Sequence, residues 1–293
     1  MEKKIIAVVG ATGLQGKGVV NALMKEGSFK VRAITRDPNK YQGQADEVAQ
    51  ADLMDPESLI NAFKDAHGVF VVTNFWEGAD ELAQGDIAVK AAKKANVNHF
   101  VWSTLPNVEK ISNGQFVVPQ FTGKAKVDSL VRNAGFANYT FVQPPFYFQN
   151  FKGHTAPQQQ QDGSIGWMLP IDPNKKVIHM GDISDLGKVV AGAFLNPGKV
   201  GKGSYLSLAT ELNSFNDVLK VFKANGKEYS FNYVPAEVFS SFFEGAGALA
   251  QLLAYFESYS YMGPSSDAQI QMAKEISTEP FTPLDEWIKL NAL

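Results

Sequence analysis

Short apolar runs alternate with amphipathic segments along the first half of the chain. Runs of four to six mostly apolar residues predict strands, and apolar positions three or four apart predict helices. The expected strands lie at 5–9, 30–34, 48–51, 68–72, 99–103 and 139–143, and the expected helices at 14–26, 56–65, 79–95 and 121–135. This alternation is typical of a parallel sheet covered on both faces. We therefore predict an α/β fold, a Rossmann-type doubly wound parallel sheet with right-handed crossovers.

The pattern changes after Asn150. Strand-like runs at 165–169, 176–179, 204–208 and 229–234 alternate with helical stretches at 185–195, 216–225, 236–260 and 283–290. The aromatic residues of 236–260 are typical of core or pocket lining, and do not by themselves indicate a cofactor site. We predict a Rossmann domain over 1–150 and a smaller C-terminal α+β lobe for substrate or partner over 151–293. Some segments of this lobe are expected to return to the main sheet, and a cleft is expected between the two parts.

Three glycines, Gly10, Gly13 and Gly16, follow the first apolar run directly. A strand that turns sharply into a helix with almost no side chains lets a phosphate approach the backbone, where free helix N–H groups point at it. The spacing differs from the usual G-x-G-x-x-G, but the strand before it and the helix after it are the required context. The sequence therefore predicts a dinucleotide site, to which we assign Gly10, Thr12, Gly13, Leu14, Gln15 and Gly16.

The end of the second strand distinguishes NADP from NAD. NAD-binding proteins place an acid there for the ribose hydroxyls, whereas this chain has Arg36, whose guanidinium suits a 2′-phosphate. Lys40 can reinforce this charge. Asp37 can serve as the acid of an NAD site, but Pro38 after it favours a turn-forming role. We predict NADP(H) as the cofactor.

Further contacts are expected where other strands end, because ligands of open α/β sheets lie at the carboxyl ends of the strands. Asp52 and Leu53 are expected near the adenine. The stretch from Thr73 through Asn74 and Phe75 to residue 76 is expected near the riboses and the pyrophosphate, and Ser103 also ends a strand at this edge.

Composition narrows the possible functions. Of 293 residues, 45% are hydrophobic and 19% charged, with a net charge of −3, which gives no long-range attraction to nucleic acid or anionic lipid. No apolar stretch approaches the ~20 residues of a membrane span. The chain has no cysteine, which excludes disulfides, thiolate catalysis and Cys-ligated zinc, and its four histidines lack metal-ligand spacing. Because the N-terminus leads directly into a core strand, we expect no secretory signal. We expect a cytoplasmic protein, and a nuclear location stays open as well.

Several longer motifs resemble the NmrA-like family. They are VVGATGLQG at 8–16, ITRDP at 34–38, VTNFWE at 72–77, VPQFTGKAKVD at 118–128, PPFYFQN at 144–150, DISDLGKVV at 182–190 and TPLDEW at 282–287. The resemblance covers nearly the whole chain and is strongest to the NADPH-sensing, HSCARG-like branch. NmrA-like proteins are atypical short-chain dehydrogenases/reductases, and some of them are negative regulators of transcription factors or signalling proteins.

One catalytic residue of ordinary short-chain dehydrogenases is absent. Their Tyr-x-x-x-Lys supplies a general acid and a lysine that lowers its pKa and holds the nicotinamide ribose. Here the frame reads Gln120 to Lys124, and an amide cannot replace the acid. The resemblance leaves Lys124 a ribose-binding role. It also implies cofactor contacts for Tyr147, Phe148 and Asn150 within a Tyr-Phe-x-Asn segment.

Two functions remain open at this point. The first is a redox sensor that binds NADP(H) without turnover and acts through a protein partner such as a transcription factor, not through nucleic acid or a membrane. The second is an NADPH-dependent reductase of quinones or similar electron-poor molecules, in which Lys124 is the catalytic acid or base and Ser103 or Thr104 orients a carbonyl. A homodimer, the partner's identity and the substrate are left open.

Overall fold

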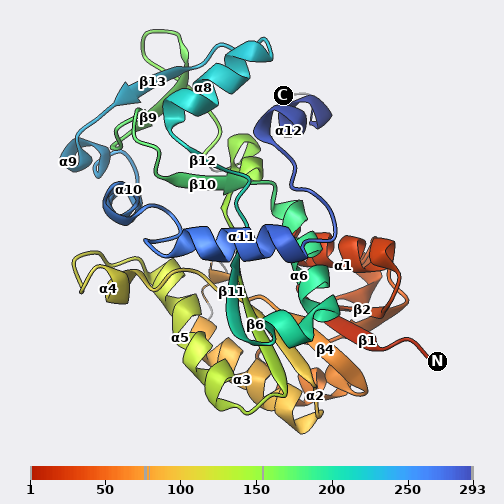
Figure 1. Ribbon diagram of the computed structural model, residues 1–293. Helices are drawn as coiled ribbons and strands as arrows, with labels where there is room; N and C mark the ends of the chain where they lie inside the picture. Colours follow the sequence, from red (N-terminus) through yellow and green to blue (C-terminus); the bar gives the residue numbers. More distant parts are fainter. Residues whose placement is uncertain (1, 76–77, 79, 154, 292–293) are drawn as a thin grey trace.

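Seven parallel strands form the central sheet of the computed structural model, which describes residues 2–75, 78, 80–153 and 155–291 (Figure 1). They are β1 (Ile5–Val9), β2 (Lys30–Thr35), β3 (Glu47–Gln50), β4 (Ala66–Val71), β5 (His99–Ser103), β6 (Asn138–Gln143) and β11 (Lys202–Ser207), in the order β11-β6-β5-β4-β1-β2-β3. Each neighbouring pair is parallel. The first six strands have the Rossmann order 3-2-1-4-5-6, so the predicted fold class is confirmed.

Helices cover both faces of this sheet. α1 (Leu14–Glu26), α6 (Leu186–Leu195) and α11 (Ser266–Ile276) lie on one face, while α2 (Pro56–Phe63), α3 (Glu81–Lys94) and α5 (Pro119–Asn133) cover the other (Figure 1). Alternate residues of β1 separate the two cores, because successive strand side chains point to opposite faces. Ile6 and Val8 enter the core beneath α1 and α6, and Ala7 and Val9 enter the core beneath α2 and α3.

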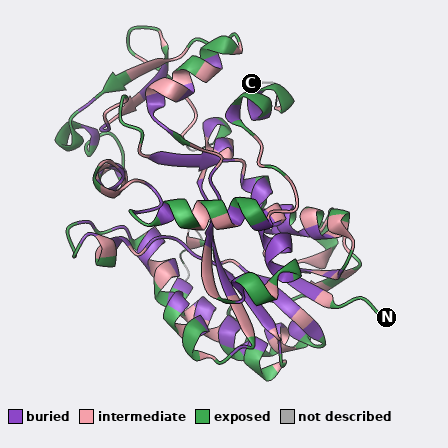
Figure 2. Ribbon diagram, viewed as in Figure 1, coloured by how far each residue is buried: buried purple, intermediate pink, exposed green. Residues whose placement is uncertain are grey.

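Smaller elements build the rest of the C-terminal region. One three-stranded sheet contains β7 (Phe146–Tyr147), β10 (Ile178–Gly181) and β12 (Glu211–Asn213), and another contains β8 (Gln158–Gln159), β9 (Ile165–Leu169) and β13 (Ser230–Tyr233). The helices are α8 (Phe215–Ala224), α9 (Ala236–Phe239), α10 (Ala246–Tyr259) and α12 (Leu284–Leu290), with short turns at α4 (Val108–Ile111), α7 (Pro197–Val200), η1 (Pro38–Lys40), η3 (Phe148–Lys152) and η4 (Ile183–Asp185). A third core, in which half of the buried residues are aromatic, lies among them. Figure 2 shows that several of these elements contain buried residues.

The C-terminal half differs from the sequence prediction in its helices. The helix expected over 236–260 is broken into α9 and α10, because Gly245 has a φ of 91° and starts a new helix. Helix α11 was not predicted. A C-terminal segment does return to the main sheet: the strand predicted at 204–208 is β11, which pairs with β6 at the edge of that sheet. Segments on both sides of residue 150 therefore build the Rossmann sheet.

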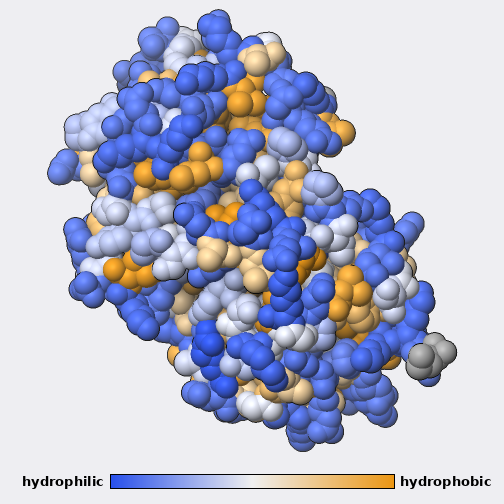
Figure 3. Space-filling model, viewed as in Figure 1, coloured by the Kyte–Doolittle hydropathy of each residue, from blue (hydrophilic) through white to orange (hydrophobic). Residues whose placement is uncertain are grey.

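Surface polarity agrees with the composition. On the face shown in Figure 3, hydrophilic residues cover most of the surface and hydrophobic residues form separate patches between them. Among the described residues, no helix combines the length and the apolar character that crossing a bilayer requires.

Candidate functional site

The turn between β1 and α1 is built around the three glycines. Gly10 has a φ of 71°, and the Gly13 N–H donates to the Gly10 carbonyl at 2.9 Å, which closes the turn. A Cβ on Gly16 would lie 2.1 Å from this same carbonyl oxygen. The first turn of α1 therefore lies directly against the strand end, and only glycine fits there.

This turn has the geometry of an anion site. The first backbone hydrogen bond of α1 runs from the Lys17 N–H to the Gly13 carbonyl at 2.9 Å. Within the described chain, the N–H groups of Leu14, Gln15 and Gly16 donate to no backbone carbonyl, and Gly13 provides no side-chain cap. Thr12, Gly13 and Leu14 are exposed. Free N–H groups at the positive end of a 13-residue helix fit a pyrophosphate.

Replacing Gly16 with alanine is expected to remove nucleotide binding and to lower the free energy of unfolding by about 1–3 kcal/mol, because the new methyl group forces α1 away from the Gly10 carbonyl. Calorimetric titration and urea denaturation measure the two effects. Gly27→Ala, at the far end of the same helix, is the control: its Cβ meets nothing within 4 Å, although its φ of 81° carries some strain. Normal nucleotide affinity in the Gly16 variant would contradict the proposed cradle.

The end of β2 carries the residues expected to choose the nucleotide. Arg36 is exposed, immediately after Thr35. The Asp37 carboxylate accepts the Asn39 N–H at 3.1 Å and caps η1, as the following proline predicted. Lys40 pairs with Asp37 at 3.4 Å, but its side chain is 84% exposed, so water and salt weaken this pair. Arg36 and Lys40 are both exposed, and both lie in the segment that follows β2.

The residues expected near the adenine follow β3. The Asp52 carboxylate is exposed and accepts the Met54 N–H at 2.8 Å, while Leu53 is half-buried and packs against the core. Asp52 therefore shapes the turn before α2, and Leu53 offers apolar surface on this loop beside the more exposed Met54.

A buried bridge of hydrogen bonds connects three of the predicted site residues. Ser103 donates to Gln15 Oε1 at 2.6 Å, and Gln15 Nε2 donates to the Tyr147 hydroxyl at 2.8 Å. Burial raises the pKa of Tyr147 to about 12. Gln15 is thus directed toward the ends of β5 and β7, and Tyr147 stays protonated at neutral pH.

Lys124 lies in a second buried cluster. Its Nζ donates to the Thr73 carbonyl at 2.8 Å, the Thr73 hydroxyl at 2.9 Å and Glu81 Oε1 at 2.6 Å. Thr73 Oγ1 also donates to Glu81 Oε1, at 2.7 Å. Burial lowers the pKa of Lys124, and the Glu81 carboxylate acts in the opposite direction. Sequence reasoning missed Glu81, because nothing in the linear sequence links a helix-start glutamate to a lysine on α5.

The remaining predicted site residues differ in how far they are buried. Asn74 is exposed and Phe75 half-buried, while the residue expected beside them at position 76 lies outside the described residues. Phe148 is fully enclosed, with its ring 5.7 Å from that of Trp287, so its side chain offers no surface to a cofactor in this conformation. Asn150 is half-buried, and its carbonyl accepts the Thr155 N–H. Gln120, at the position of the absent acid, is half-buried on α5.

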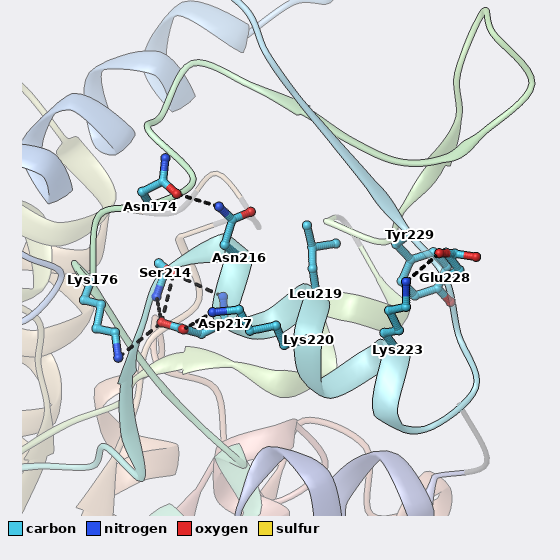
Figure 4. Close-up of a pocket in the computed structure, with 10 residues that line it drawn as sticks. All are labelled: Asn174, Lys176, Ser214, Asn216, Asp217, Leu219, Lys220, Lys223, Glu228 and Tyr229. Atoms are coloured by element: carbon cyan, nitrogen blue, oxygen red, sulfur yellow. Dashed lines mark hydrogen bonds and ion pairs between the residues drawn. The ribbon is translucent and has the colours of Figure 1, made fainter.

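Two pockets lie outside the glycine turn. One, of about 470 Å³, lies along α8 and is lined by polar and charged side chains that pair with one another, including Lys176 with Asp217 at 3.5 Å and Lys223 with Glu228 at 3.0 Å (Figure 4). The other lies between the starts of α3 and α5 and is lined by Phe75, Glu81 and their neighbours. The described residues contain no group of three or more His, Asp or Glu side chains that could hold a metal ion.

Comparisons with known proteins agree with the geometry. FrzB, an NmrA-like family domain-containing oxidoreductase from Cladobotryum sp, is 31% identical over 256 residues, which are 78% of this chain and 76% of that protein. NmrA, a negative transcriptional regulator that has also been solved with NADP and with NAD, superposes with a TM-score of 0.82 at 24% identity and covers 100% of this chain and 99% of its own. The NADPH-dependent quinone oxidoreductase QOR2 of Escherichia coli has a TM-score of 0.78 at 20% identity, with 98% and 100% covered. The NmrA-like family matches residues 2–288, and this chain belongs to that family.

Proposed function

We propose that the protein binds NADP(H) and acts as a redox sensor. In this proposal the nucleotide's oxidation state controls binding to a protein partner in transcription or signalling, with little or no turnover. The glycine turn of α1 would hold the pyrophosphate, and Arg36 would hold the 2′-phosphate. When bound, the reduced nicotinamide would supply a hydride to an acceptor, and the proton that completes a carbonyl reduction would come from a separate donor. The similarity to NmrA, described as a negative transcriptional regulator, supports the regulatory role.

The observation that carries the proposal is the state of Lys124. An ammonium group has three N–H donors, and here all three are engaged by Thr73 and Glu81. At the position of the usual acid the chain has Gln120, which is no acid at neutral pH. The phosphate end is therefore open to a ligand, while the expected proton-transfer end is occupied by internal hydrogen bonds.

Calorimetric titration with NADP⁺ and NADPH tests the binding, and NADPH oxidation in the presence of quinones and enones tests the turnover. The proposal expects heat of binding for both nucleotides and a negligible rate with every acceptor. The absence of binding, or fast turnover at micromolar acceptor, would refute it.

Arg36→Ala is expected to weaken NADPH binding by about 10- to 100-fold and NADH binding by less than about threefold, because only NADPH carries the 2′-phosphate that forms charge-assisted hydrogen bonds. Titration of both nucleotides against wild type and variant measures this. Lys17→Ala, an exposed lysine on α1, is the control for a general loss of positive charge. Equal losses for NADPH and NADH would contradict the assignment of Arg36.

A reductase is the second candidate, favoured by the names of FrzB and QOR2. A quinone that accepts a hydride can take its proton from water, so the missing tyrosine does not exclude this reaction. Under this hypothesis Lys124→Met would abolish the rate with a modest loss of binding, and rapid NADPH oxidation by the wild type would select the reductase over the sensor.

A further inference from the structure

Glu81 is the charge partner of Lys124, and the two side chains are almost fully enclosed, with exposures of 3% and 9%. Glu81 is the first residue of α3, directly after the N-cap Asp80, whose carboxylate accepts the Leu82 N–H at 2.9 Å. Lys124 reaches the pair from α5. Thr73, which lies just beyond the end of β4 at Val71, forms hydrogen bonds with both side chains of the pair.

The strand order of the main sheet relates the position of the Lys124–Glu81 pair to the expected nucleotide site. β1 and β4 are neighbours, and the strand order reverses between them. Dinucleotides of doubly wound sheets bind at this switch point, beyond the carboxyl ends of the strands. Thr73, and with it the Lys124–Glu81 pair, therefore lies at the edge where the nucleotide is expected.

The pair is also electrically balanced. Lys124 contributes one positive charge and Glu81 one negative charge at 2.6 Å, so their fields largely cancel beyond the cluster. Glu81 Oε1 accepts from both Lys124 and Thr73, while Oε2 is buried without a hydrogen-bond partner among the described residues. Nothing in the geometry leaves Lys124 as an uncompensated cation.

We propose that Glu81 sets the preference of the site between oxidised and reduced nucleotide, by cancelling the positive charge of Lys124 beside the expected nicotinamide position. The oxidised nicotinamide ring carries a positive charge, and the reduced ring is neutral. An uncompensated ammonium nearby would repel the oxidised form alone. With Glu81 in place, both forms meet a neutral pair. This inference rests on the proposed binding of NADP(H).

The test is the ratio of the dissociation constants for NADP⁺ and NADPH, measured by calorimetry in the wild type and in Glu81→Gln. The variant keeps the size of the side chain and removes its charge. Because Glu81 also raises the pKa of Lys124, the titrations are run at about pH 6, which favours the ammonium form of Lys124 in the variant. There we expect the ratio to rise by about tenfold, through weaker binding of NADP⁺, since a unit charge in a buried site changes a charged ligand's affinity by at least about this amount. Glu109→Gln is the matched control, because Glu109 lines the same pocket but is half-exposed and 3.9 Å from Lys126. Its ratio should stay within about twofold of the wild type.

The double variant Glu81→Gln/Lys124→Met keeps the inference testable if the single variant does not fold. It removes both charges, so its ratio should remain within about twofold of the wild type. A severalfold shift of the double variant toward NADP⁺ would mean that Lys124 acts as a free cation in the wild type, and would overturn the inference. An unchanged ratio in folded Glu81→Gln would also overturn it while leaving the proposed function intact. If the wild type binds neither nucleotide, the proposed function itself fails.

Discussion

Replacing Lys124 with methionine is expected to lower the free energy of unfolding by about 3–5 kcal/mol, because it leaves the buried Glu81 carboxylate without its cation. The Glu81 side chain is 3% exposed, and in the variant its only hydrogen-bond donor among the described side chains would be Thr73. The loss of the Lys124–Glu81 attraction accounts for the smaller part of this decrease in the free energy of unfolding. Most of the penalty comes from the charge that stays behind in a place without water.

Urea denaturation monitored by tryptophan fluorescence measures the effect of Lys124→Met. Lys126→Met is the control on the same helix, since its side chain is 53% exposed and its partner Glu109 is 3.9 Å away. This control should change stability by less than about 0.5 kcal/mol. Adding Glu81→Gln to Lys124→Met should recover most of the loss, because the orphaned charge is then gone. A cost below about 1 kcal/mol for Lys124→Met alone would contradict the buried pair.

The main sheet could be predicted from the sequence because its strands are buried on both faces. Such strands are mostly apolar runs, as in 68–72 and 99–103, and a helix usually follows each of them to reach the next parallel strand, although β2 and β3 are joined by a loop with only the short η1. The predicted bounds therefore agree closely with the structure: α1 and β5 match completely, and β2 is one residue longer. The Gly13–Leu14 junction also follows from the sequence, since the glycine spacing fixes where the helix can begin.

Other features of the fold depend on contacts that the local pattern does not contain. β11 is a recognisable strand, but its pairing with β6 is decided by the helices between them. α11 exposes Asp267, Gln271, Lys274 and Glu275, and it packs on α6 and β11. Tertiary packing supplies most of the stability of such a polar helix, so a propensity argument misses it.

The candidate site likewise has one part that neighbouring residues determine and another part that depends on contacts between residues far apart in the sequence. The phosphate cradle is local, because three glycines within seven residues determine it. The partners of Lys124 and Gln15 are not local: Glu81 is 43 residues from Lys124, and Tyr147 is 132 residues from Gln15. Such pairs require the register of several strands and the rotation of two helices. The sequence predicts Lys124 and Tyr147 as site residues, and only the structure identifies the groups that hold them.

His99→Gln is expected to make the protein resist acid better than the wild type. His99 starts β5, where its Nε2 lies 2.9 Å from the Thr140 hydroxyl and its ring meets the edge of Phe194 at 5.1 Å. Thr140 donates its own proton to the Val200 carbonyl, so His99 must be the donor of this bond. Burial lowers the pKa of His99 to about 3, from an ordinary value of 6.5. Between about pH 3 and pH 6.5 the His99 ring is therefore neutral in the folded protein and protonated in the unfolded chain.

The sign of the effect follows from proton binding. Between pH 6.5 and about 3 the unfolded chain holds a proton on His99 that the folded chain lacks, so stability falls as the pH falls through this window. At pH 4 the loss from this one group is about 3 kcal/mol. The overall pH curve does not isolate it, because burial raises the pKa of Asp128 to about 6, and that group adds stability as the pH falls from about 6 to 4. The difference between wild type and His99→Gln cancels Asp128.

Urea denaturation of both proteins at pH 7 and pH 4.5 gives this difference. His99→Gln loses some packing at both pH values, but its stability should decline between them by about 2–3 kcal/mol less than that of the wild type. His67→Gln is the control: His67 is half-exposed on β4, and its pKa is also lowered by burial, so it should reduce the decline by a smaller amount. The expected signal is the change in the free energy of unfolding between pH 7 and pH 4.5. A general packing defect lowers stability equally at both pH values and therefore does not produce this signal. Parallel pH curves for wild type and His99→Gln would show that the buried ring already accepts a proton in the folded state, and the enclosure of β5 between Thr140 and Phe194 would then be wrong.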